Sequence, residues 1–188
     1  MKIKSLFLAA LVGFLALSTA SAKSLVVYFS RTGENYAVGN ISEGNTAIIA
    51  KMIAAKTGSD IFEIIPEKDY PAAYKACTDV AKAEQKQKAR PAYKDDVDTS
   101  GYDTIYIGYP IWWGDMPLVV YTFLEKHDLN GKTILPFCTQ EGSGVSGTDG
   151  KIKRLYKNAT VKQALAVRGA TAQNERAKAE KAVDEWLR

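Results

Sequence analysis

Hydroxyl side chains, glycine and the start of a predicted helix come together in the first stretch that can bind a ligand. It begins with Ser30, Arg31 and Thr32 and continues through a Gly/Asn/Ser-rich segment to Asn45 and Thr46. Backbone N–H groups, hydroxyls and a helix dipole all favour an anion, so the stretch predicts a phosphate cradle. It has neither the Gly-Lys-Ser/Thr ending of a nucleoside triphosphate loop nor the G-x-G-x-x-G pattern of a dinucleotide site. An ordinary loop capped by Asn45 or Thr46 is the alternative interpretation.

Two adjacent tryptophans lie in the second stretch, within a loop bounded by glycine and proline. Neighbouring side chains rarely share one face of a core, whereas indole rings in a loop suit stacking on a flat ring. The alternative is one buried tryptophan beside a partly exposed one. The candidate ring-lining residues are Pro110, Ile111, Trp112, Trp113 and Gly114.

The third stretch is rich in glycine and serine. These residues let the backbone approach a ligand closely and present N–H donors to its polar edge. A flexible surface loop of similar composition is the alternative. The candidates at this edge are Thr139, Glu141, Gly142, Ser143 and Gly144.

Each of the three stretches follows a run of apolar and β-branched residues that predicts a strand. The run at residues 25–29 has no polar interruption, as expected for a strand that is covered on both faces. Helical periodicity and stop signals indicate helices between the strands. The predicted strands span residues 25–29, 61–65, 104–108, 132–138 and 162–167. The predicted helices span residues 45–56, 71–89, 116–126, 149–156 and 173–187.

Strands that alternate with helices predict an α/β fold with a parallel sheet. Right-handed crossovers then place helices on both faces, which gives a three-layer, doubly wound sandwich. Such sheets bind ligands at the carboxyl ends of their strands, near the point where the strand order reverses. We therefore expect the three stretches to meet at one edge of the sheet.

The first 22 residues differ in character from the rest of the chain. Lys2 and Lys4 precede an apolar run at residues 6–17, and small residues at 20–22 follow it. This pattern is typical of a secretory signal peptide, with cleavage expected after Ala22. The apolar run is short for a membrane anchor. We expect an exported protein, periplasmic or extracellular, with no membrane anchor after cleavage and one domain over residues 23–188.

The composition fits a globular domain and excludes fibrous, disordered and disulfide-rich classes. The 188 residues are 46% hydrophobic and 24% charged. The net charge of +4 is too small to predict nucleic-acid binding. Cys77 and Cys138 fall in a predicted helix and a predicted strand, so two buried thiols are favoured over a disulfide. His127 is the single histidine, and with no clustered cysteines the sequence predicts no metal site.

A phosphate cradle, an aromatic platform and a polar edge on neighbouring strand ends describe a flat aromatic mononucleotide, and flavin mononucleotide (FMN) fits best. The same motifs resemble the flavodoxin family, over nearly all of residues 24–188. The resemblance is closest to the branch with a lengthened first loop that occurs in exported bacterial proteins. It rests on residues 26–33 (VVYFSRTG), 44–46 (GNT), 108–114 (GYPIWWG), 136–139 (PFCT) and 141–144 (EGSG).

The resemblance implies non-covalent FMN and a five-stranded sheet in the order 2-1-3-4-5. Ser30, Thr32, Asn45 and Thr46 would hold the phosphate, and Arg31 would add charge. The second and third stretches would line the ring and its other edge.

The sequence also departs from the usual flavodoxin pattern in two respects. Residues 33–43 lengthen the first loop, and Tyr36 within it is a candidate either to stack on the ring or to cap the loop. Flavodoxins are typically acidic, whereas residues 23–188 carry 23 basic and 21 acidic side chains. We therefore do not assume that an acidic face docks on a basic partner.

Three functions are compatible with these residues. The favoured one is electron transfer on FMN, with a redox donor and acceptor that the sequence does not identify. The second is an FMN-dependent enzyme that reduces quinones or similar compounds with a nicotinamide donor. The third is a flavin-free domain whose cradle binds another phosphate ligand.

Overall fold

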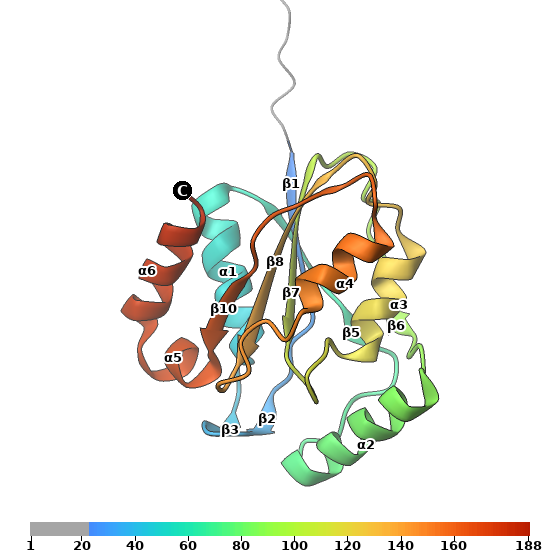
Figure 1. The fold of residues 1–188 in the computed structure, drawn as a ribbon. Coiled ribbons are helices and arrows are strands. Elements are labelled where there is room, and N and C mark those ends of the chain that lie inside the picture. Colours follow the sequence, from blue (N-terminus) through green and yellow to red (C-terminus); the bar gives the residue numbers. More distant parts are fainter. Residues whose placement is uncertain (1–22) are drawn as a thin grey trace, which may run out of the picture.

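Five parallel strands form the centre of the computed structural model, which describes residues 23–188 (Figure 1). They are β1 (Ser24–Tyr28), β4 (Asp60–Glu63), β7 (Thr104–Pro110), β8 (Thr133–Gln140) and β10 (Leu165–Arg168). They lie in the order β10-β8-β7-β1-β4, and every neighbouring pair is parallel. When these five strands are numbered 1 to 5 in chain order and read from β4 to β10, the order is 2-1-3-4-5, which confirms the expected topology. The predicted signal peptide, residues 1–22, lies outside the described residues.

The strands are apolar on both faces because each face covers its own core. Along β1, Leu25 and Val27 enter one core, whereas Val26 and Tyr28 enter the other. All four side chains are buried. Alternate side chains of a strand point to opposite faces, so only an unbroken apolar run satisfies both cores. The run at residues 25–29 was predicted to be a strand covered on both faces, and β1 confirms this prediction because each of its faces packs into a core.

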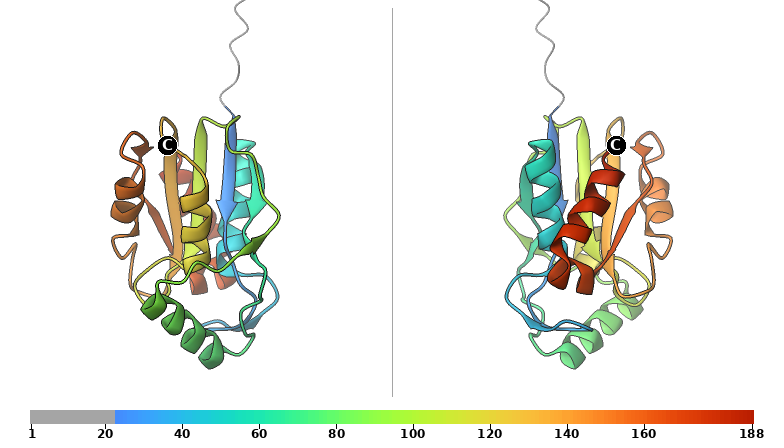
Figure 2. Two further views of the ribbon diagram at one scale, coloured as in Figure 1. Left: turned by 90° about the vertical axis from the view of Figure 1, so that its right-hand side faces the viewer. Right: turned by 90° about the vertical axis from the view of Figure 1, so that its left-hand side faces the viewer.

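Two helical layers cover the sheet (Figure 2). One layer packs its buried side chains into the core of Val26, and the other packs into the core of Leu25. No helix within residues 23–188 has the length and apolar character needed to cross a membrane. The first layer consists of α1 (Asn45–Thr57), α5 (Gly169–Asn174) and α6 (Arg176–Trp186), and the second of α3 (Leu118–Lys126) and α4 (Thr148–Leu155).

The remaining helix, α2 (Tyr74–Gln87), belongs to neither layer. It lies beyond the carboxyl ends of the strands, at the bottom of Figure 1. It buries only Cys77 and Ala81, both small. A helix with so little buried apolar surface is held by other contacts, and these contacts lie at the candidate site.

Several predicted element boundaries were wrong. The helix expected at 71–89 begins only at Tyr74, because the carbonyls of Pro71 and Ala72 accept hydrogen bonds from Arg31 instead of from the next helical turn. The helix expected at 173–187 begins at Gly169 and is divided by Glu175, which ends α5 and begins α6. Short pairs of strands were also missed. They are β2 (Gly33–Asn35) with β3 (Gly39–Ile41), β5 (Ile65–Pro66) with β6 (Tyr93–Lys94), and β9 (Thr160–Val161) with β8.

The lengthened first loop, residues 33–43, is thus an antiparallel hairpin. Gly33, Ala37 and Gly39 have positive φ angles of 81°, 65° and 70°, which allow the tight reversal. The hairpin lies below the end of β1 in Figure 1, near α2.

The close packing of β7 against β8 gives a first prediction. A Cβ atom added at Gly108 would lie 2.1 Å from the ring of Phe137, which is fully buried. We expect Gly108→Ala to lower the free energy of unfolding by about 1–3 kcal/mol, the usual cost of overpacking. Urea unfolding measures the loss. Gly101→Ala, with no atom within 4 Å of the added carbon, is the control; equal stability of the two variants would contradict the packing.

Candidate functional site

An open pocket of about 230 Å³ lies at the carboxyl edge of the sheet, and we call it the carboxyl-edge pocket. The loops after β1, β7 and β8 form three of its walls, as predicted from the strand ends. The helix α2 forms the fourth wall, which was not predicted. The predicted residues that line it are Arg31, Asn45, Pro110, Ile111, Trp112, Trp113, Thr139 and Glu141.

The N-terminus of α1 faces this pocket with free donors. Gly44 precedes the helix and supplies no side-chain cap, and the first turn carries no acidic residue. Among the hydrogen bonds within residues 23–188, none is made by the N–H groups of Asn45 and Thr46. The next N–H, that of Ala47, donates to Oγ of Ser30 at 3.1 Å. Two unpaired donors at a helix N-terminus suit an anion.

Close packing fixes the shape of this cradle. A Cβ atom at Gly44 would lie 2.1 Å from Oγ of Ser30 and 2.6 Å from the carbonyl oxygen of Arg31. Glu43 beside it forms ion pairs with Lys51 and Arg176, and their hydrogen bonds lower the pKa of the carboxyl group. The negative charge next to the cradle is therefore balanced. Ser30 and Thr32 border a separate groove and not the carboxyl-edge pocket.

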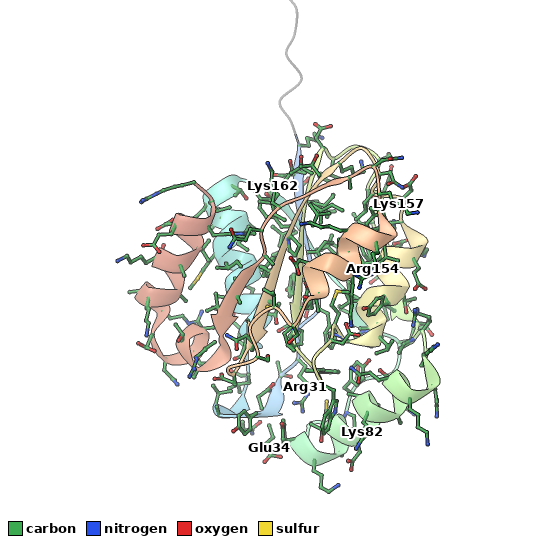
Figure 3. The ribbon with its side chains drawn as sticks, viewed as in Figure 1. Arg31, Glu34, Lys82, Arg154, Lys157 and Lys162 are labelled. Atoms are coloured by element: carbon green, nitrogen blue, oxygen red, sulfur yellow. The ribbon has the colours of Figure 1, made fainter. Side chains whose placement is uncertain are left out.

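The Arg31 side chain ties the hairpin to the segment before α2. It donates to the carbonyl oxygens of Glu34, Pro71 and Ala72 at 2.6–2.8 Å. The side chain of Glu34 in turn accepts the N–H of Tyr74, the first residue of α2. Figure 3 shows Arg31 and Glu34 at this end of the molecule, with Lys82 on α2 nearby. Arg31 lines the pocket and brings positive charge to it, but its donors are engaged in positioning the chain.

Thr46 and Thr139 join the first and third walls. Both are buried, and their hydroxyl oxygens lie 2.7 Å apart. The hydroxyl of Thr46 thus contacts β8, while its N–H remains a free donor of the cradle. The backbone N–H of Ile111 also donates to the carbonyl oxygen of Thr139 at 2.9 Å, which links the second wall to the third.

The two tryptophans occupy different environments, as the alternative interpretation described. Trp112 is half-buried, with Phe29 and Tyr70 edge-on at centroid distances of 5.4 and 4.9 Å. Trp113 is 57% exposed. Trp113 and Gly114 have φ angles of 49° and 73°, the pattern of a tight turn between Trp112 and Asp115. Gly114 therefore shapes the turn and does not line the pocket.

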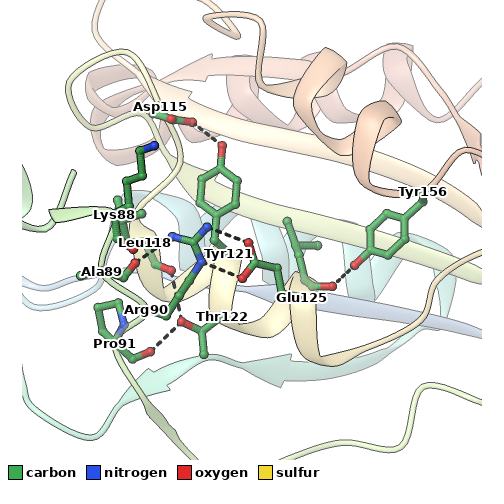
Figure 4. A network of polar contacts seen from close by, with 11 residues as sticks. Lys88, Ala89, Arg90, Pro91, Asp115, Leu118, Tyr121, Thr122, Glu125 and Tyr156 are labelled. Carbon is green, nitrogen blue, oxygen red and sulfur yellow. Dashed lines mark hydrogen bonds and ion pairs between the residues drawn. The ribbon is translucent and has the colours of Figure 1, made fainter. Parts of the chain in front are cut away.

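Asp115 anchors this turn. Its Oδ1 accepts hydrogen bonds from the N–H of Met116 and the hydroxyl of Tyr121, and its Oδ2 lies 2.5 Å from the Nζ of Lys151. Figure 4 shows Tyr121 directed at Asp115, beside the ion pair of Arg90 with Glu125. These three contacts hold the carboxylate of Asp115 in place, and they thereby fix the turn that carries the two tryptophans.

Sequence reasoning missed the contribution of α2. The indole N–H of Trp113 donates to the carbonyl oxygen of Thr78 at 3.0 Å, and Gln85 donates to the carbonyl oxygen of Trp112 at 2.9 Å. The missed pocket residues are Asn35, Tyr74, Cys77, Thr78, Ala81 and Gln140. The only sequence signal in α2 is the pair of small residues at positions 77 and 81, one helical turn apart, which gives no apolar stripe. Tyr36, which was considered for stacking, lies 6.1 Å from the ring of Tyr74 between centroids.

The glycine-rich third wall also differs from the prediction. Gly142, Ser143 and Gly144 do not line the pocket, whereas Gln140 does. Glu141 lines it too, but its Oε1 accepts the N–H of Ala170 at 2.7 Å and so fixes the start of α5.

Comparison with protein families shows to which family the chain belongs. A family model described as Flavodoxin matches residues 23–186. The chain belongs to the flavodoxin family.

Solved structures agree with this assignment of the flavodoxin fold. A candidate flavoprotein from Bacteroides eggerthii DSM 20697 is 32% identical, with a TM-score of 0.69 over 88% of this chain and 96% of that one. Another from Bacteroides uniformis ATCC 8492 is 31% identical, with a TM-score of 0.68 over 88% and 97%. A flavoprotein from Lactobacillus acidophilus NCFM, solved in complex with FMN, is 22% identical, with a TM-score of 0.63 over 89% and 100%. Comparison with curated proteins gave no match.

The donors and surfaces of the flavodoxin pocket fit FMN, the cofactor that the family resemblance implies. The free N–H group of Asn45 at the start of α1 suits its phosphate, and the indoles of Trp112 and Trp113 suit its ring. Thr46 itself does not line the pocket. The wall that contains Thr139 and Gln140 suits a polar ring edge. The assignment of individual residues to FMN stays a prediction.

His127 and the cysteines play other parts in this flavodoxin. His127 directly follows the last residue of α3, at the helix end where it was predicted, and its Nε2 lies 2.9 Å from Oδ1 of Asp96. Cys77 and Cys138 are free, buried thiols, which confirms the prediction. Burial raises the pKa of both thiols, that of Cys138 to about 12.

Thiol reactivity tests this burial. With a pKa of about 12, roughly one Cys138 thiol in ten thousand is ionised at pH 8. We expect an aromatic disulfide reagent to leave both native thiols unmodified for minutes and to titrate two thiols after unfolding. Cys77→Ser and Cys138→Ser show which thiol reacts. Titration of no thiols in unfolded protein would reveal a disulfide and contradict the structure.

Proposed function

We propose that this member of the flavodoxin family binds FMN in the carboxyl-edge pocket and transfers electrons in the bacterial cell envelope. One observation carries the proposal: Asn45, which begins α1 with a free backbone N–H group, lines the same pocket as Trp112 and Trp113. An anion site beside an aromatic platform matches a phosphate joined to a flat ring.

The residues of the pocket supply binding and electrostatics. FMN, when bound, accepts and donates one or two electrons. Trp113 offers its exposed face, and the Nζ of Lys82 lies 5.2 Å from the centroid of that ring. The positive charge of Lys82 beside the platform would favour the gain of negative charge by a ring bound there. The helix α2 contacts this platform, where the carbonyl oxygen of Thr78 accepts the indole N–H of Trp113.

The segment at residues 1–22 supports placement in the envelope. Its positive start, apolar run and small-residue exit are those of a signal peptide cleaved after Ala22. The partners would then be envelope redox proteins or small acceptors. Because residues 23–188 are almost neutral in net charge, such partners need not be basic.

A second candidate is an FMN-dependent reductase of quinones or related compounds that uses a nicotinamide donor. The observation in its favour is the wall contributed by Tyr74, Thr78 and Ala81 of α2, since a walled pocket can hold a small substrate next to the ring. Sustained oxidation of a nicotinamide in the presence of a quinone would establish the reductase.

Anaerobic reductive titration tests the carrier. Purified residues 23–188, supplied with FMN, should bind one equivalent and become yellow. Reduction should then proceed in two resolved one-electron steps, without turnover of a nicotinamide and a quinone. A protein that stays colourless after gel filtration would refute FMN binding.

Fractionation tests export. Expression of the full chain in a Gram-negative host should yield a periplasmic protein whose first residue is Lys23. Lys2→Glu together with Lys4→Glu should slow processing, because a positive start promotes translocation. Recovery of uncleaved protein in the cytoplasm would contradict the proposal.

The cradle gives a sharper prediction for FMN. In Gly44→Ala the added carbon would overlap Oγ of Ser30 and displace the N-terminus of α1. We expect FMN affinity to fall at least about tenfold, equivalent to roughly 1.4 kcal/mol. Gly150→Ala in α4, where the added carbon makes an ordinary contact at 3.6 Å, is the control. Equal quenching of flavin fluorescence by both variants would place the phosphate elsewhere.

A further inference from the structure

Gln140, the last residue of β8, folds its side chain back over the loop that follows it. Its Oε1 accepts the N–H of Gly142 and, at 3.2 Å, the N–H of Gly144. These glycines have φ angles of 117° and 59°, which turn their N–H groups toward one point. Because both neighbours are donors, the oxygen of the amide faces the loop and the nitrogen faces away from it.

This contact changes which atoms are free to meet a ligand. The N–H groups of Gly142 and Gly144, predicted to bind the ring edge, already have an acceptor. The Nε2 of Gln140 makes no hydrogen bond within residues 23–188, and the half-buried side chain lines the carboxyl-edge pocket. A donor with two hydrogens is therefore available at this wall.

The adjacent polar side chains are already engaged. The hydroxyl of Thr139 pairs with that of Thr46, and Glu141 accepts the N–H of Ala170. The negative charge of Glu141 would also repel a carbonyl oxygen of a ligand placed at this wall. Gln140 is thus the side chain of this wall whose donor has no partner.

We propose that the Gln140 carboxamide recognises the polar edge of the bound ring, with Oε1 locked by the loop and Nε2 donating to a ring carbonyl oxygen. The proposal rests on FMN binding as proposed above. The isoalloxazine ring carries two carbonyl oxygens on its pyrimidine half, and each accepts such a bond. Gln140 is a specificity-determining residue because its amide selects an acceptor at this edge and disfavours a ring that presents an amino group there.

Affinities of matched variants test the role of the amide. Gln140→Ala removes the donor and the loop contact, whereas Gln140→Glu keeps an oxygen for the loop and replaces the donor by an acceptor. A neutral hydrogen bond is worth about 0.5–1.5 kcal/mol, so we expect Kd for FMN to rise roughly 2- to 12-fold in Gln140→Ala. Gln140→Glu should bind at least as weakly. Gln163→Ala and Gln163→Glu, at an exposed position outside the pocket, are the matched controls and should bind as the wild type does.

Thio analogues of FMN locate the partner atom. Sulfur accepts hydrogen bonds weakly, so wild-type protein should lose affinity for either 2-thio-FMN or 4-thio-FMN relative to FMN, and Gln140→Ala should lose that difference. Thermal unfolding without ligand establishes that each variant is folded.

The outcomes separate this inference from the proposed function. If the wild-type protein binds FMN and Gln140→Ala or Gln140→Glu binds it with the same affinity, the inference alone is overturned, because other groups then recognise the ring edge. Failure of wild-type protein to bind FMN overturns the proposed function and the inference with it.

Discussion

The parallel alignment of the strands is the constraint on which the rest of the structure depends. Tyr28 of β1 pairs with Gly108 of β7, and Pro110 of β7 pairs with Thr139 of β8, so three strand ends reach one edge together. Two cores bury both faces of the sheet and fix this register, because a shift by one residue would exchange the side chains between them. The cradle, the tryptophan turn and the glycine-rich loop converge for that reason, although far apart in the chain.

The pocket itself is closed by polar contacts. The helix α2 buries little apolar surface, and its position depends on backbone carbonyls that accept donors from Arg31, Trp113 and Gln85. Such hydrogen bonds are individually modest in net free energy, at about 0.5–1.5 kcal/mol each. A wall held in this way can open more easily than the sheet can deform, which suits an element that borders a ligand.

The sequence predicts the fold and most of the pocket because both depend on side-chain type. Unbroken apolar runs such as residues 25–29 require a doubly covered sheet, and Asn45, Trp112, Trp113 and Thr139 line the pocket at its carboxyl edge. The place of α2 could not be predicted, since the acceptors at Pro71, Ala72 and Thr78 are carbonyls that every residue has. Gln140 was missed because the nearby glycines already accounted for the N–H donors that the loop was expected to present to the ring edge. The break at Glu175 has no glycine or proline to announce it.

Amide chemical shifts of ¹⁵N-labelled residues 23–188 during titration with FMN test the central claim most directly. If FMN binds in the carboxyl-edge pocket, large shifts are expected at Asn45 and Thr46, at Trp112 and Trp113 including the indole N–H, and along 74–81 of α2. Residues at the opposite edge of the sheet, such as Asp103 and Lys132, should shift little. Shifts confined to that opposite edge, or no shifts at all, would contradict the account.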